Sequence, residues 1–151
     1  MKFRQLVFWL LLPVILSAQT IVTVKDGDIN ANDNVTWTSD NEYLLDGLVF
    51  VESGATLTIQ PGTIIRGKEV PTTGDNTSAL IIVRGAQIFA EGTANAPIIF
   101  TAENDDVNDP NDLLPTDRGL WGGVIILGNA RINTAAGEGQ IEGIDPNEVR
   151  A

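Results

Sequence analysis

The feature that most constrains this chain is a short apolar pattern that recurs around three small-residue pairs. The pairs are Gly54-Ala55, Gly85-Ala86 and Asn129-Ala130. Apolar residues flank each pair at spacings of two, which is the period of a β-strand. The aligned columns are Val49, Leu80 and Val124; Val51, Ile82 and Ile126; Leu57, Ile88 and Ile132; and Ile59, Ala90 and Thr134. Each unit is therefore predicted to be two short strands that meet at a bend.

The bend residues predict corners at recurring places along the chain. Gly54, Gly85 and Asn129 are of the types that enter the left-handed backbone conformation at least cost. The two intervals between successive pairs are unequal, the second being the longer. Such intervals fit a rung of roughly 20 to 25 residues that carries loops. Loop insertions are expected at 69–78 and 103–119, which are rich in Pro, Gly, Asn and Asp.

The pattern predicts an all-β fold in which every coil stacks on the one before it. No amphipathic helix of useful length follows Ala18, so crossover helices cannot connect the strands. We therefore expect a right-handed parallel β-helix with N-terminal capping strands. In that fold Val51 stacks on Ile82, and Ile82 stacks on Ile126. The alternative is an antiparallel β-sandwich, whose tight two-residue hairpin signals are missing here.

The first residues have the pattern of an export signal. Lys2 and Arg4 precede the apolar run LVFWLLLPVIL, and the small residues of SAQ follow it. Residues 1–18 are therefore predicted to be a signal peptide, and the chain to be secreted or placed on the outer cell surface. The remainder divides into an N-terminal cap at 19–47 and the first β-helix rungs at 48–151. We expect this coil to be incomplete at its C-terminus, because IEGI at 141–144 begins another strand.

The charge of the chain limits its partners. It has 9 Lys and Arg against 20 Asp and Glu, a net charge of −11. Loss of residues 1–18 removes two basic residues, which leaves 7 against 20 and a net charge of −13. Nucleic acid and anionic lipid are excluded, since both bind through Lys and Arg. No later segment is apolar and long enough to span a membrane. The expected partners are polysaccharide or cell-surface components and further rungs of the same chain.

An acidic stretch within 103–119 is the strongest candidate for ion binding. Its carboxylates are Asp105, Asp106, Asp109, Asp112 and Asp117. Carboxylates close together in sequence can supply oxygen ligands for Ca²⁺. Their spacing matches no defined calcium motif, so the sequence favours a solvated loop whose charge keeps an exported protein soluble. No cofactor is expected; if Ca²⁺ binds, the candidate ligands are Asp105, Asp106, Asp109 and Asp112.

Catalytic residues cannot be assigned from the sequence. An enzyme on this scaffold would cut acidic polysaccharide with paired carboxylates, or with Ca²⁺ and a basic residue. The scattered candidates are Asp40, Glu42, Asp46, Glu52, Arg66, Arg84 and Arg131. The arginines equally fit rim residues whose stems cover apolar surface. The chain has no His and no Cys, which removes the commonest general base, most transition-metal sites and any disulfide.

Trp121 is the one aromatic residue placed among glycines, between Gly119 and Gly122. A Trp in such a place can act as a platform on which a sugar stacks. The sequence favours the simpler interpretation, in which Trp121 packs where the long loop rejoins the coil.

Several phrases of the chain resemble a known family. They are WTSDNEYLLDGLVFVESGATLTIQPGTIIRG, SALIIVRGAQIFAEGTANAPIIFTA, GLWGGVIILGNARINT and IEGI, within Val35 to Ile144. These phrases resemble the opening of a family of secreted bacterial β-helix surface proteins, often labelled hypothetical or "multidrug transporter". The resemblance implies a parallel β-helix at the cell surface with several more rungs, and no established activity. Family members often start from a lipid-anchored Cys, which is absent here.

Two functional hypotheses follow from these observations. The leading one is a non-catalytic, exported structural or adhesive β-helix segment that presents loops at the cell surface. The alternative is the N-terminal part of a polysaccharide-active β-helix lyase or hydrolase whose site lies outside this chain.

Overall fold

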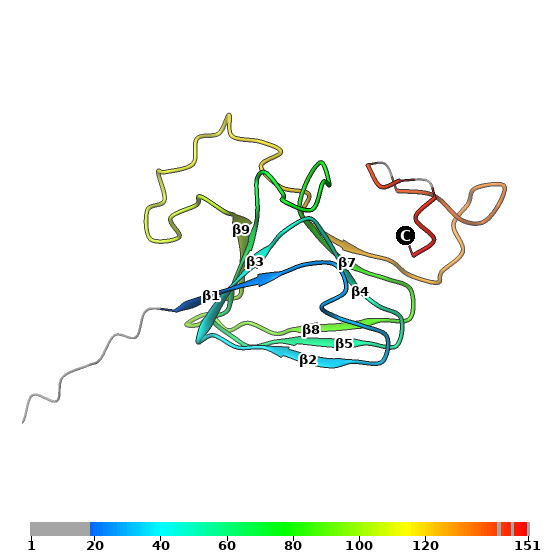
Figure 1. The fold of residues 1–151 in the computed structure, drawn as a ribbon, viewed down its shortest axis with the longest axis horizontal. Helices are drawn as coiled ribbons and strands as arrows, with labels where there is room; N and C mark the ends of the chain where they lie inside the picture. Colours follow the sequence, from blue (N-terminus) through cyan, green and yellow to red (C-terminus); the bar gives the residue numbers. More distant parts are fainter. Residues whose placement is uncertain (1–18, 142, 146, 151) are drawn as a thin grey trace, which may run out of the picture.

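The fold is an all-β coil of parallel strands (Figure 1). The computed structural model describes residues 19–141, 143–145 and 147–150. The predicted signal peptide at 1–18 lies outside the described residues. Within the described part of the chain every regular element is a β-strand, and no helix occurs.

The strands form three sheets, which we call A, B and C. Sheet A contains β1 (Thr20–Val24), β3 (Asn41–Leu45), β6 (Ile64–Gly67) and β9 (Ile99–Ala102). Sheet B contains β2 (Asn34–Trp37), β5 (Thr56–Ile59) and β8 (Gln87–Ala90). Sheet C contains β4 (Leu48–Val51), β7 (Ala79–Ile82) and β10 (Val124–Ile126). Neighbouring strands within each sheet are parallel.

The register confirms the predicted parallel β-helix and contradicts the antiparallel sandwich. Ile82 pairs directly with Val51 on one side and with Ile126 on the other. Leu57 pairs with Ile88 in sheet B. The first turns of the coil carry no long loop: Asn34 at the start of β2 pairs with Thr56 at the start of β5. Each turn of the coil therefore contributes one strand to a sheet, and inward side chains stack in columns.

Two aromatic rings lie at the N-terminal end of the coil's interior. The rings of Trp37 and Tyr43 stack with their centroids 4.7 Å apart and an interplanar angle of 16°. Both side chains are buried, and the Tyr43 hydroxyl accepts a hydrogen bond of 2.9 Å from the N–H of Thr38. The segment expected as a cap, 19–47, supplies these rings. Its strands β1, β2 and β3 also belong to sheets A and B.

Two of the three predicted corners are confirmed. Gly54 and Gly85 have φ angles of 83° and 87°, in the left-handed region that favours glycine. The N–H of Gly54 donates to the carbonyl oxygen of Gly85 at 3.0 Å, so the two corners stack. The corner predicted at Asn129 is wrong. Among the described residues Asn32 is the only non-glycine with positive φ.

The predicted second strand of the third unit is also wrong. The N–H of Leu127 still donates to the carbonyl of Ile82 at 2.9 Å, so the coil continues to that residue. Without a left-handed corner at Asn129 the chain then leaves the coil. Ile132, which the sequence predicts to stack on Ile88, is 49% exposed. Its N–H donates to Gly137 instead, and Thr134 lies in no strand.

The outer face of sheet C is apolar and covered by the end of the chain. Phe50 and Ile81 point away from the coil's interior, yet both are buried. Ile144 is buried against them, and Ile141 packs on the same cluster. Figure 1 shows this last segment beside β4 and β7. The strand expected at 141–144 is not formed by the described residues there, because Ile144 packs on sheet C rather than extending it.

Candidate functional site

Two long loops leave the coil at the same corner, between sheets A and C. Residues 69–78 lie between β6 and β7, and residues 103–119 follow β9 on the way to β10. They form the green and yellow loops of Figure 1. One turn earlier, only Asp46 and Gly47 connect β3 to β4. The two loops 69–78 and 103–119 therefore lie on the same edge of the coil.

A column of alternating charge follows the ends of the sheet A strands. Its members are Lys25, Asp46, Lys68 and Glu103, each the residue directly after β1, β3, β6 or β9. The N–H groups of Asp46, Lys68 and Glu103 each donate to the previous turn at 2.9 Å, so the ladder extends past the strands. Unlike charges therefore lie on neighbouring turns, which is a favourable arrangement.

Asp46 anchors the first loop. Its side chain is 2% exposed and accepts hydrogen bonds from the N–H and the hydroxyl of Thr72, at 2.6 and 2.5 Å. The ammonium groups of Lys25 and Lys68 lie 3.4 and 3.6 Å from Oδ2. Burial acts to raise the pKa of Asp46, but the Thr72 hydrogen bonds and the two lysines outweigh it and lower the pKa to about 2. The carboxylate is therefore ionised, and both of its oxygens interact with neighbouring polar groups.

Ser78 and Asp75 fix the other end of the first loop. The Ser78 hydroxyl accepts a hydrogen bond of 3.1 Å from the N–H of Gly47 and donates one of 2.8 Å to the carbonyl of Lys68. The carboxylate of Asp75 accepts a hydrogen bond of 3.1 Å from the N–H of Leu48. The loop is thus held at both ends by the tight corner of the preceding turn.

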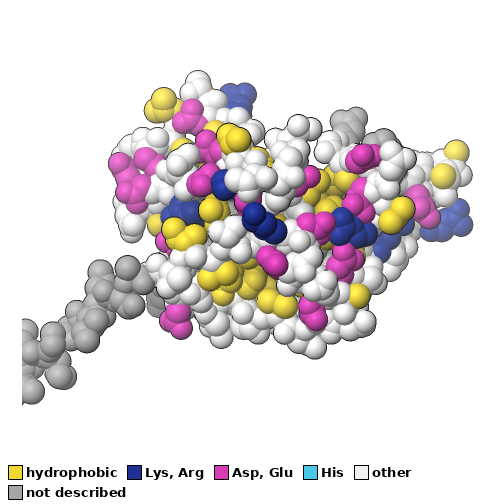
Figure 2. All heavy atoms as spheres, viewed as in Figure 1, with side chains coloured by type: hydrophobic (Ala, Val, Ile, Leu, Met, Phe, Trp, Pro, Cys, Tyr) yellow, Lys and Arg dark blue, Asp and Glu magenta, His cyan; other side chains and the backbone are white. Residues whose placement is uncertain are grey.

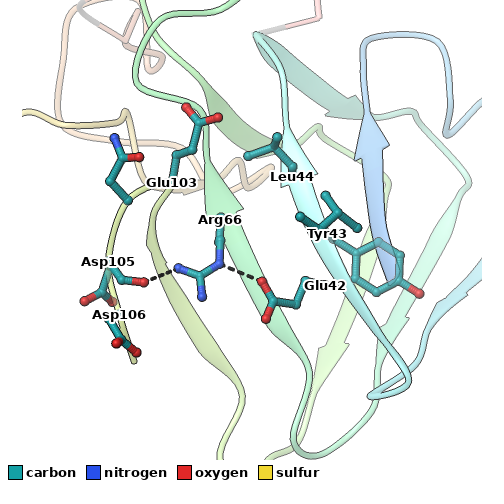
Figure 3. Close-up of a pocket in the computed structure, with 9 residues that line it drawn as sticks. Glu42, Tyr43, Leu44, Arg66, Glu103, Asp105 and Asp106 are labelled. Atoms are coloured by element: carbon teal, nitrogen blue, oxygen red, sulfur yellow. Dashed lines mark hydrogen bonds and ion pairs between the residues drawn. The ribbon is translucent and has the colours of Figure 1, made fainter. Parts of the chain in front are cut away.

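Beside the second loop, a groove of about 390 Å³ lies on the outer face of sheet A (Figure 3). Its lining includes Ile21, Leu44, Glu42, Arg66, Glu103, Asp105 and Asp106. Arg66 Nε donates to Glu42 at 2.8 Å, and both side chains are largely buried. Arg66 Nη1 donates to the main-chain carbonyl of Asp105 and to that of Ala102. Arg66 therefore ties the start of the second loop to the sheet.

The acidic side chains of the second loop shape its own turns. Asp106 and Asp109 accept hydrogen bonds of 3.0 Å from the N–H groups two residues later, at Asn108 and Asn111. Asp117 accepts from Leu114 at 2.8 Å, Asp112 from the N–H of Asp106, and Asp105 from the hydroxyl of Thr101. In the described part of the chain no three Asp, Glu or His residues form a group that could hold a metal ion. The candidate Ca²⁺ ligands Asp105, Asp106, Asp109 and Asp112 line one pocket of this loop, but they do not form such a group.

The other candidates from the sequence lie at separate places. Glu52 contacts Arg150 at 2.8 Å beside sheet C, while Arg84 lies 3.4 Å from Glu138 on the surface. Asp40 and Arg131 are exposed. Trp121 is partly buried and packs against Gly67 and the core, as expected. No pair of carboxylates with the separate environments of an acid and a base is assembled from these residues.

Arg150 forms a cluster that sequence reasoning missed. Its guanidinium lies 3.8 Å from the Phe50 ring centroid and bonds to Glu148, Asp26 and Glu52 at 2.7 to 2.9 Å. These carboxylates raise the pKa of Arg150, Glu148 most of all, and Arg150 lowers the pKa of Glu148 to about 2. The continuous apolar runs LVFV and ALII are typical of strands that are covered on both faces. These runs could have predicted that another part of the chain covers the outer face of sheet C.

The surface agrees with the acidic composition. Figure 2 shows acidic side chains spread over this face, with a group at the second loop. No helix among the described residues is long and apolar enough to cross a membrane.

Three parallel sheets wound into one coil, with loops at a common corner, define the class of parallel β-helix proteins. The model of the family described as "Pectate-lyase like beta helix domain" matches residues 27–145, so the chain belongs to that family. A search of curated proteins found no match to the chain, and neither did a search of solved structures.

Proposed function

We propose that the chain is a non-catalytic, exported structural or adhesive β-helix segment that presents the loops 69–78 and 103–119 at the cell surface. One observation carries this proposal: Asp46 at the corner of the coil and Arg66 in the groove are both engaged in anchoring those loops. Asp46 binds Thr72, and Arg66 binds Glu42 and the carbonyl of Asp105.

The chemistry of polysaccharide cleavage supports the same conclusion. Elimination needs a basic group free to take a proton, whereas the Arg66 guanidinium is paired with Glu42 at 2.8 Å. Hydrolysis needs one carboxyl that stays protonated near neutral pH beside one that is ionised. The pKa of Asp46 is lowered, which is the wrong direction for a general acid. The loop carboxylates accept hydrogen bonds from their own loop and its neighbouring strand.

Surface presentation is supported by charge and by family. The predicted signal at 1–18 directs export, and β-helix domains of the pectate-lyase-like type are often extracellular. The net charge of −13 that remains after loss of residues 1–18, with 7 basic against 20 acidic residues, disfavours anionic partners, so neutral polysaccharide or cell-surface components are the expected ligands of the loops.

Cysteine labelling on intact cells tests the presentation of the loops, because the chain has no native Cys. Asn111→Cys places a thiol in the exposed second loop, and Ala55→Cys places one at a fully buried corner. A membrane-impermeant maleimide should label Asn111→Cys on the cells that export the chain. Ala55→Cys should react only after denaturation. Labelling of Asn111→Cys only after lysis would contradict surface presentation.

The second candidate function is part of a polysaccharide lyase or hydrolase whose catalytic groups lie outside this chain. The groove of about 390 Å³ beside Arg66 favours it, since its volume falls in the range of small-ligand sites. Because those groups lie outside this chain, the candidates differ in whether the full-length protein cuts polysaccharide, which is a direct measurement.

A further inference from the structure

The last turn of the coil has an open position in sheet B. Sheet A gains β9 and sheet C gains β10 in that turn, but within the described residues sheet B ends at β8. One edge of Gln87–Ala90 therefore carries no parallel neighbour. Phe89 on this strand is 48% exposed, and Ile88 is only partly buried. An unpaired edge with exposed apolar side chains is a template for another strand.

The residues that follow β10 have the pattern of the missing strand. Ala130 aligns with Ala55 and Ala86, and Ile132 aligns with Leu57 and Ile88. The coil is in register up to Leu127, whose N–H bonds to Ile82. Only Gly128 and Asn129 separate this last paired position from Ala130. The segment 130–134 therefore follows the last paired position at the same sequence spacing as 86–90 follows Val83, which precedes the corner at Gly85.

The present packing of this segment is open. Ile132 is 49% exposed, and it lies with Ile126 and Ala130 along a cavity of about 350 Å³. Its local hydrogen bonds join it to 137–138: the N–H of Ile132 donates to the carbonyl of Gly137 at 3.0 Å, the N–H of Gly137 donates to the carbonyl of Thr134 at 2.9 Å, and the Thr134 hydroxyl donates to the carbonyl of Glu138 at 2.6 Å. Ile132, Thr134 and Glu138 are exposed, so water can replace hydrogen bonds at these residues, although Gly137 is buried.

We propose that the open edge of β8 is a docking site for this chain's own residues Arg131–Thr134, which add to it as the fourth strand of sheet B. The proposed register pairs Gln87 with Arg131, Ile88 with Ile132, Phe89 with Asn133 and Ala90 with Thr134. It continues the observed columns by one turn. This inference is independent of the function proposed above.

Asn129 is the hinge of this rearrangement. Gly54 and Gly85 turn the two preceding corners with positive φ, whereas Asn129 does not have positive φ in the structure. Asparagine adopts the left-handed conformation more readily than most residues. Rotation at Asn129 redirects the chain along β8, where Ile132 covers Ile88 and the strand edge gains its hydrogen bonds. The docked strand then offers a new edge to a further turn.

A disulfide between paired outward positions tests the docking. The double variant Phe89→Cys/Asn133→Cys places thiols on residues that are direct neighbours only in the proposed register, and neighbouring parallel strands lie about 4.8 Å apart, within disulfide reach. The matched positive control is Thr58→Cys/Phe89→Cys, which joins residues that already pair in the structure. After mild oxidation, peptide mass spectrometry should find the link between positions 89 and 133 within one chain.

The hinge supplies the second arm of the test. Adding Asn129→Gly should raise the rate of the 89–133 link about fivefold, because glycine enters positive φ without steric cost. Adding Asn129→Pro should suppress the link, because the proline ring locks φ in the negative region. Neither change should alter the 58–89 control. A link that fails to form, or forms at the same rate in both hinge variants, would overturn the proposal. A link between two chains would assign the edge to a second copy instead.

Discussion

The N–H of Thr72 donates a hydrogen bond of 2.6 Å to Oδ1 of Asp46, which belongs to the preceding turn of the coil. This contact fixes a surface loop to a buried carboxylate. Lys25 and Lys68 lie on either side of that carboxylate. A loop can thus be positioned on a coil by one charged residue at a corner.

Replacing Asp46 should destabilise the fold. Asp46→Asn keeps the shape of the side chain but removes the negative charge between Lys25 and Lys68. We expect the free energy of unfolding to fall by about 2 to 3 kcal/mol, since the bonds lost are charge-assisted and buried. Urea unfolding measures this change. The matched control is Asp40→Asn, at an exposed turn, which should change it by under about 0.5 kcal/mol. Equal effects would show that Asp46 is not an anchor.

Acid should weaken the chain through the same residue. The pKa of Asp46 is about 2 in the folded state, against 3.8 as its ordinary value. A lowered pKa means that the stabilisation is complete above about pH 4 and is lost as the pH falls from about 4 to 2. The loss amounts to on the order of 1 to 2 kcal/mol. Urea midpoints of the wild type should fall more steeply over this interval than those of Asp46→Asn. Parallel curves would contradict the shifted pKa.

Gly67 should tolerate no side chain. A Cβ at this position would lie 2.5 Å from Cε3 of Trp121, on a rigid ring. Gly67→Ala is therefore expected to lower the free energy of unfolding by about 1 to 3 kcal/mol. Gly128→Ala is the control, because a Cβ there meets nothing within 4 Å. Thermal melts of both variants distinguish them, and an unchanged melting temperature for Gly67→Ala would show that Trp121 is not packed there.

Arg66 should control the order of the second loop. Arg66→Met keeps the length of the side chain but removes its bonds to Glu42 and to the carbonyl of Asp105. Hydrogen exchange should accelerate around 103–106, while sheets B and C keep their protection. Arg118→Met, at an exposed position in the same loop, is the control and should leave 103–106 unchanged. Unchanged exchange in Arg66→Met would remove the anchoring role.

Sheets B and C were predictable from the sequence because their strands flank a repeated corner. The columns containing Ile82 and Leu57 follow from a spacing of two, and Gly54 and Gly85 mark the bends. Sheet A was not assigned, since its strands share no common pattern. One inward column runs from Leu45 to Gly67 to Ala102. The small residue Gly67 in this column leaves space for the ring of Trp121. This contact joins segments that are far apart in the sequence, so the sequence pattern does not reveal it.

The site was less predictable than the fold, because its contacts join distant turns. In the sequence, nothing distinguishes the anchor Asp46 from the other scattered carboxylates. Aligning the residues that follow each sheet A strand would have placed Asp46 between Lys25 and Lys68. The error at Asn129 has a different cause. A repeat shows which conformation a residue can adopt, but the local bonds at Ile132 and Thr134 decide which one this structure has.

The central claim is that the charged groups of the sheet A groove anchor loops and do not cut polysaccharide. The most direct test follows new chain ends in polygalacturonate and in a neutral glucan incubated with the intact chain and Ca²⁺, by the absorbance of unsaturated uronide and by reducing-end titration. Our account predicts that neither kind of end appears faster than in a blank without protein. Sustained release of either kind, abolished by Arg66→Lys, would contradict the account and make Arg66 a catalytic residue.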